Sequence, residues 1–95
     1  MVPYGEGMTL NILGKPYTIK KLKQVEASGN MGSASGPFQI ITISEGYPKE
    51  QVEETLLHEV IHIVAGELAV ELDESDVRRL AVGLYSAGCK IPVKV

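Results

Sequence analysis

This chain of 95 residues has little of several residue types, and each shortage narrows the classes of protein to which it can belong. Its one cysteine, Cys89, excludes an internal disulfide, so nothing in the composition indicates an oxidising compartment. No apolar run approaches the roughly 20 residues that a membrane-spanning helix requires. The first residues lack the basic start and the long apolar stretch of a signal peptide. We therefore expect a cytoplasmic protein without a membrane partner.

Positive charge is also scarce, with a formal net charge of −3. The lysines between residues 15 and 23 alternate with apolar residues, a pattern typical of a strand with one solvated face. No basic run is interleaved with aromatic residues, so we expect no nucleic-acid partner. The length predicts a single domain over residues 1–95. A domain this small has a thin margin of stability, which a bound metal ion would increase.

Three segments in the first half have the composition of β-strands. Residues 8–13 and 16–23 flank Gly14-Lys15, which predicts a β-hairpin with a two-residue turn. Residues 38–43 are dense in β-branched side chains and form the third predicted strand. The segment 29–36 is rich in glycine and serine and has no periodicity, so it is predicted to be a loop.

The second half is predicted to form two helices. Pro48 suits the first turn of a helix that runs to about Val70, with an apolar face made of Leu57, Ile61, Val64 and Leu68. Asp73 can cap the second helix, which Gly88 ends. The apolar face of that helix comprises Val77, Leu80, Ala81 and Leu84. The predicted fold class is α+β, a small three-stranded sheet followed by two helices.

The first of these helices carries the motif His58-Glu59-Val60-Ile61-His62. Residues four apart lie on one face of a helix, so His58 and His62 can both bind one tetrahedral Zn²⁺. A carboxylate at Glu59 can hold a water molecule and take its proton during attack on a carbonyl. Both histidines of the chain lie inside this motif. The sequence therefore predicts a zinc site in which Glu59 is the catalytic base.

A third protein ligand must be a carboxylate, because the chain has no third histidine and Cys89 lies at the far end of the second helix. Glu67 and Glu71 follow His62 at spacings that rotate them away from the histidine face. Glu74 and Asp76 lie after a turn, at the start of a helix that can fold back onto the first. Glu74 is the preferred ligand, and Asp76 is the alternative.

These residues resemble a known family. The segment from Thr55 to His62, followed by Glu74-Ser75-Asp76-Val77-Arg78-Arg79-Leu80-Ala81, is similar to small phage and bacterial zincins related to the ImmA/IrrE metallopeptidases. The resemblance covers about residues 37–88. It implies a minimal zincin core of the gluzincin type, with Glu74 as the third zinc ligand and a peptide or protein as the substrate.

The resemblance has two further implications. Zincins bind an extended substrate along an edge strand, which makes residues 38–44 the candidate strand. Gluzincins often stabilise the oxyanion with a tyrosine or histidine, and Tyr85 lies near the Glu74 face of the second helix. The function predicted from the sequence is zinc-dependent peptide hydrolysis. The alternative is a non-enzymatic protein that zinc stabilises and whose surface binds a partner.

Overall fold

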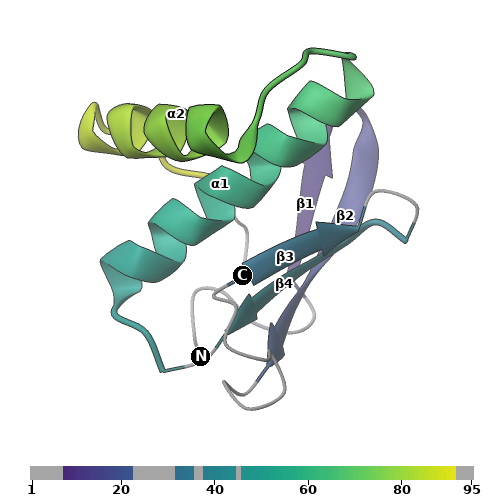
Figure 1. The fold of residues 1–95 in the computed structure, drawn as a ribbon. Coiled ribbons are helices and arrows are strands. Elements are labelled where there is room, and N and C mark those ends of the chain that lie inside the picture. Colours follow the sequence, from purple (N-terminus) through teal and green to yellow (C-terminus); the bar gives the residue numbers. More distant parts are fainter. Residues whose placement is uncertain (1–7, 23–31, 36–37, 45, 92–95) are drawn as a thin grey trace.

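Figure 1 shows one sheet, a long helix packed against it and a second helix packed on the first. The computed structural model describes residues 8–22, 32–35, 38–44 and 46–91. The elements are, in chain order, β1 (Met8–Ile12), β2 (Lys15–Leu22), β3 (Gly32–Ser35), β4 (Ile40–Ser44), α1 (Lys49–Glu67) and α2 (Glu74–Ser86). Strands followed by two helices confirm the predicted α+β class. The sheet contains one strand more than the three that were predicted.

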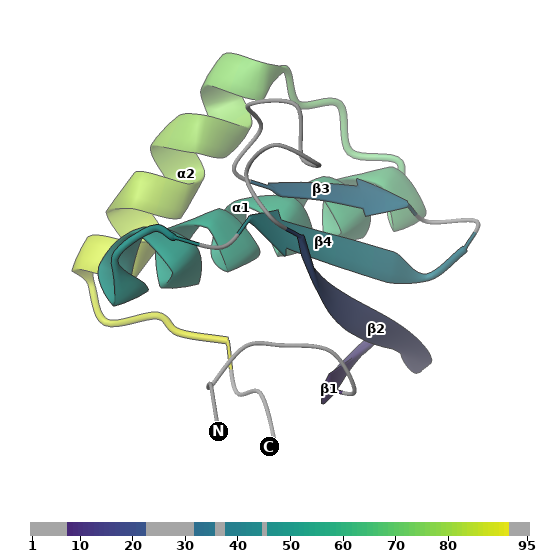
Figure 2. The same ribbon diagram turned by 90° about the horizontal axis from the view of Figure 1, so that it is seen from below.

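The four described strands lie in the order β1-β2-β4-β3. β1 pairs with β2 and β3 pairs with β4 in antiparallel fashion, whereas β2 and β4 are parallel. A parallel pair needs a connection that crosses from one end of the sheet to the other, and β3 belongs to that connection. It folds back as the outer strand, and α1 lies along β3 and β4 (Figure 2).

The predicted hairpin of β1 and β2 is confirmed, but its turn lies one residue earlier than expected. Ile12 pairs with Lys15, so the turn residues are Leu13 and Gly14. Their φ angles of 51° and 81° are both positive, as in the type I′ turns that match the twist of two paired strands. Lys15 therefore belongs to β2 and not to the turn.

The prediction of a loop over residues 29–36 is wrong for residues 32–35, which form β3; the rest of that segment lies outside the described residues. A Cβ atom added to Gly32 would lie 2.6 Å from Cγ2 of Thr55 and 3.6 Å from Cγ of Glu59. Only a residue without a side chain allows β3 to approach α1 this closely. The same small residues lack the β-branched signal of a strand, which is why composition alone predicted a loop.

The third predicted strand is present as β4, but it begins at Ile40. Phe38 and Gln39 form the turn before it, where Gln39 has a φ of 54° and donates a side-chain hydrogen bond to the carbonyl of Pro16. Phe38 is 77% exposed. Its aromatic side chain therefore contributes to the surface of the protein.

Helix α1 covers the sheet with a face slightly rotated from the predicted one. Leu56 and Ile63 belong to the hydrophobic core, and Val52, Val60 and Val64 pack against it partly buried. Leu57 is buried as predicted, but Leu68 is exposed because α1 ends at Glu67 and not near Val70. The sheet contributes the other members of the core: Leu10, Ile12, Tyr17, Ile19, Ile41 and Ile43.

Helix α2 packs against α1 and not against the described strands. The predicted cap at Asp73 is confirmed: its side chain accepts a hydrogen bond from the Asp76 amide, and the Asp73 amide donates to Oδ2 of Asp76. Of the predicted apolar face, only Val77 and Ala81 are buried. Leu80 and Leu84 remain exposed. The contact between the two helices therefore buries few apolar side chains of α2.

Candidate metal centre

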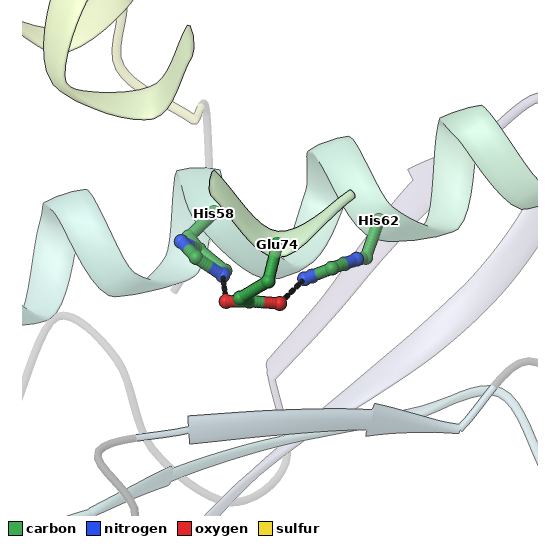
Figure 3. Close-up of side chains that lie close together, drawn as sticks. All are labelled: His58, His62 and Glu74. Atoms are coloured by element: carbon green, nitrogen blue, oxygen red, sulfur yellow. Dashed lines mark hydrogen bonds and ion pairs between the residues drawn. The ribbon is translucent and has the colours of Figure 1, made fainter. Parts of the chain in front are cut away.

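Two consecutive turns of α1 and the first residue of α2 bring three metal-binding side chains together (Figure 3). His58 and His62 are one turn apart, with ring centroids separated by 4.9 Å. Each of these histidines and Glu74 offers one ligand atom, and all three atoms lie within 4.8 Å of one another. The structure thus gathers the three residues that the sequence selected as the preferred metal ligands.

The Glu74 carboxylate lies between the two imidazoles and contacts both. Its Oε1 is 2.7 Å from Nε2 of His58, and its Oε2 is 2.8 Å from Nε2 of His62. Figure 3 shows the two ring nitrogens pointing toward the same carboxylate from successive turns. Both Nε2 atoms therefore point to one place, which leaves Nδ1 of each ring for other partners.

The alternative ligand Asp76 has a different role in this structure. Its backbone amide and its carboxylate complete the reciprocal cap with Asp73, which stabilises the first turn of α2. Because that cap fixes where α2 begins, it also fixes the position of Glu74 as the first helical residue. Glu67 is directed elsewhere as well, since its carboxylate pairs with Nζ of Lys15 at 3.0 Å.

Burial and charge act in opposite directions on the Glu74 carboxyl. The small loss of solvation raises its pKa, but the hydrogen bonds and positive charge of His58 and His62 outweigh that effect and lower the pKa below its usual value. An ionised carboxylate at the start of a helix is also favoured by the helix dipole. Glu74 is therefore in the anionic form that a metal ligand requires.

The donor set fits a zinc ion. Two imidazole nitrogens and one carboxylate oxygen are the protein ligands of one class of catalytic zinc site. Zinc bonds of about 2.0–2.1 Å at tetrahedral angles place ligand atoms roughly 3.3 Å apart. The carboxylate and the imidazoles are now about 0.5 Å closer than that, so small side-chain rotations would make room for the ion. The side chains of His58, His62 and Glu74 are 18%, 36% and 58% exposed, which leaves the site accessible from solvent.

Glu59 lies beside this group on α1, at the side that faces β3. Its side chain is buried, and Gly32 of β3 lies against it. Burial raises the pKa of the Glu59 carboxyl, an effect that the charges of His58 and His62 partly offset and that of Glu74 reinforces. A carboxylate with a raised pKa is a stronger proton acceptor than an ordinary surface glutamate.

Tyr85 lies away from the three ligands, near the other end of α2. Its hydroxyl donates a hydrogen bond of 2.8 Å to Oε1 of Glu53, a buried residue of α1. Eleven residues separate Tyr85 from Glu74, which is about 16 Å along a helix axis. The hydrogen bond gives Tyr85 a role in joining the two helices. Its predicted contribution to an oxyanion site stays a prediction.

The strand that borders the ligands is not the one expected. Residues 38–44 were the candidate substrate strand, but β4 lies in the interior of the sheet between β2 and β3. β3 pairs on one side only within the described part of the chain, and it lies against α1 beside Glu59. The edge next to the site is thus formed by Gly32–Ser35.

Two cavities adjoin His62. One, of about 270 Å³, lies between α1 and the sheet and is lined by Tyr17, Ala34, His62, Ile63, Gly66 and Glu67. The other, of about 590 Å³, lies where α1 is followed by α2 and includes Leu72, Asp73 and Val77 in its lining. Sequence reasoning did not associate Tyr17 or Ala34 with the site, because both lie in strands far from the motif in sequence.

No protein-family model, curated protein or solved structure matches this chain. Among the described residues, neither helix combines the length and the apolar character that crossing a membrane would require.

Proposed function

We propose that this chain is a zinc-dependent metallopeptidase of the zincin type, related to the ImmA/IrrE metallopeptidases. The contact of Glu74 with both His58 and His62 is the observation that carries the proposal. It joins the helical motif to a third ligand that lies 12 residues beyond His62. The donor set, the open side of the group and the buried Glu59 together fit hydrolysis better than a purely structural metal site.

Each side chain has a defined task in this proposal. His58, His62 and Glu74 would hold the zinc ion, which would supply Lewis-acid chemistry by lowering the pKa of a water molecule and polarising the substrate carbonyl. Glu59 accepts the proton of the attacking water and then delivers it to the nitrogen of the departing amine. The raised pKa of Glu59 supports both halves of this proton transfer.

An extended peptide segment is the proposed substrate. The outer edge of β3 offers backbone groups with which a substrate strand can pair, and β3 packs against the helix that carries Glu59. Ala34 of that strand is exposed and lines the cavity beside His62. The substrate backbone is thereby held in the extended form that exposes one carbonyl to the metal.

The decisive experiment replaces Glu59 with glutamine and measures both zinc binding and cleavage of a peptide library. The E59Q variant should keep its zinc and lose roughly 10²- to 10⁴-fold in cleavage rate, because only proton transfer is removed. The matched control is E50Q, which makes the same change at an exposed position of α1 and should cleave like the parent.

Equal cleavage by the E59Q variant and the parent would refute the role of Glu59. A parent protein that binds zinc tightly and cleaves no peptide would instead support the alternative, a non-enzymatic protein that zinc stabilises. Absence of zinc binding would refute both. Measurements on one preparation of metal-loaded protein therefore distinguish the two candidate functions.

A further inference from the structure

The proposed catalytic base, Glu59, lies on the face of α1 that packs against β3, where its side chain is buried. Proton transfer requires its carboxylate to stay within hydrogen-bond reach of the attacking water. A glutamate side chain rotates about several bonds, so it keeps one position only if neighbouring residues restrict it. Two residues are placed to do so: Thr55, one turn earlier on α1, and Gly32 on β3.

Thr55 shares with Glu59 the face of α1 that lies against β3. The two residues are four apart, and helical side chains lean toward the N-terminus, so the Glu59 side chain extends over the turn that carries Thr55. Thr55 is itself buried, and its Oγ1 donates a hydrogen bond of 2.7 Å to the carbonyl of Gln51. This hydrogen bond occupies the hydroxyl and holds one rotamer, in which the Cγ2 methyl group points to β3.

Gly32 packs against both of these side chains from the sheet. A Cβ atom at this position would lie 2.6 Å from Cγ2 of Thr55, 3.1 Å from the carbonyl oxygen of Thr42 and 3.6 Å from Cγ of Glu59. Carbon atoms in contact are normally about 3.5–4.0 Å apart, so the space between β3 and Thr55 is already filled. The backbone of β3 and the Thr55 methyl group therefore restrict Glu59 from two sides.

From this packing we infer that Thr55 and Gly32 are positioning residues of the proposed reaction, which together hold the Glu59 side chain in one conformation beside the candidate metal ligands. This inference rests on the proposed function. Gly32 has no side chain and the Thr55 hydroxyl is bonded to Gln51, so both residues act through Glu59 and not on the substrate. The Thr55 methyl group is the part that matters.

The first test compares two substitutions of Thr55 in the full, zinc-loaded chain. T55S keeps the hydroxyl and removes the methyl group, so kcat should fall roughly tenfold, less than the roughly 10²-fold that a misplacement of about 1 Å can cost. KM and the zinc dissociation constant should not change, because the candidate ligands lie between α1 and α2. T55V restores the methyl group without the hydroxyl and should recover most of the rate. T9S is the matched control, since Thr9 is exposed in β1.

The second test fills the same space from the strand. G32A introduces a methyl group where Cγ2 of Thr55 already lies, so kcat should fall roughly 10²-fold. In that background T55S should raise kcat, because the new methyl group takes the place of the one removed. The same substitution thus lowers the rate in the parent and raises it in G32A. G83A is the matched control, since a Cβ atom at Gly83 of α2 would meet nothing within 4 Å.

A third readout depends neither on cleavage nor on metal. Nuclear magnetic resonance relaxation of the Glu59 Cγ methylene group in the metal-free chain should show greater mobility in T55S than in the parent or in T55V. A methylene group equally ordered in all three proteins would overturn the inference.

The rates distinguish this inference from the proposed function. Cleavage by T55S at the parent rate, or a T55V protein as slow as T55S, would overturn the inference and leave the proposed function intact. A G32A protein that T55S does not improve would also overturn it. If G32A does not fold, the comparison of T55S with T55V decides. Failure of the parent to cleave any peptide would refute the proposed function, and this inference with it.

Discussion

The two sides of α1 are held by different kinds of interaction. Toward the sheet, α1 contributes Leu56 and Ile63 to a continuous apolar core. Toward α2, the buried apolar residues of the second helix are only Val77 and Ala81. Polar pairs add to this second contact, namely Glu74 with the two histidines and Tyr85 with Glu53. Hydrophobic burial thus stabilises the sheet side, and specific polar contacts position α2.

The difference matters because Glu74, the candidate third ligand, and the two histidines lie on opposite sides of the weaker contact. A metal ion that binds all three would join the helices where few apolar groups do so. We therefore expect substitutions in the core to unfold the whole chain. Removal of the metal, or substitutions in the contact between α1 and α2, should affect mainly α2.

The largest effect is expected from Ile41→Ala. Ile41 is fully buried in β4, and truncation of such a residue costs about 2–5 kcal/mol through lost burial and the cavity left behind. Urea denaturation followed by circular dichroism measures the loss. The control is Ile40→Ala in the same strand, because Ile40 is only partly buried. Equal losses for the two variants would contradict the described core.

A smaller effect is expected from zinc. Zinc at 100 times its dissociation constant should stabilise the folded chain by about 2.7 kcal/mol, since only the folded state gathers the three ligands. Hydrogen exchange should show the greatest slowing in α2, whose position depends on the metal centre. His62→Ala removes one ligand and should abolish the gain. An equal gain in that variant would place zinc elsewhere.

The smallest of the three effects is expected from Tyr85→Phe. This change removes the hydroxyl that donates to the buried carboxylate of Glu53, with a cost of about 1–3 kcal/mol. Thermal unfolding measures the stability, and hydrogen exchange of α2 locates the change. If Tyr85 served the oxyanion as well, kcat of the variant would fall with KM nearly unchanged. Unchanged stability would show that the bond to Glu53 does not hold α2.

The amino-acid sequence alone predicted the structural features that depend on local patterns of residues. Helical spacing placed His58 and His62 on one face, and the Asp73 cap located the start of α2, and with it Glu74. These predictions succeeded because helix periodicity and capping act over three or four residues. The α+β order of the elements follows from similar local signals.

The features that were missed depend on packing between distant segments. Gly32 belongs to a strand because α1 lies directly against it, a fact that its neighbours in sequence do not reveal. The edge strand beside the site is β3 and not the predicted segment 38–44, because the connection from β2 folds back onto β4. Leu68 became exposed because α1 ends one residue before it. Tyr17 reaches a cavity at His62 only through the sheet topology.

The reciprocal cap between Asp73 and Asp76 has a consequence for the entropy of metal binding. All three candidate ligands lie within residues 58–74, so the chain segment that a metal ion would close is short, and its closure would cost little. The cap orders the last part of that segment before any ion arrives. Two helices and the turn between them would therefore act as a preorganised chelating unit for a metal ion, and the described strands contribute none of the three candidate ligands.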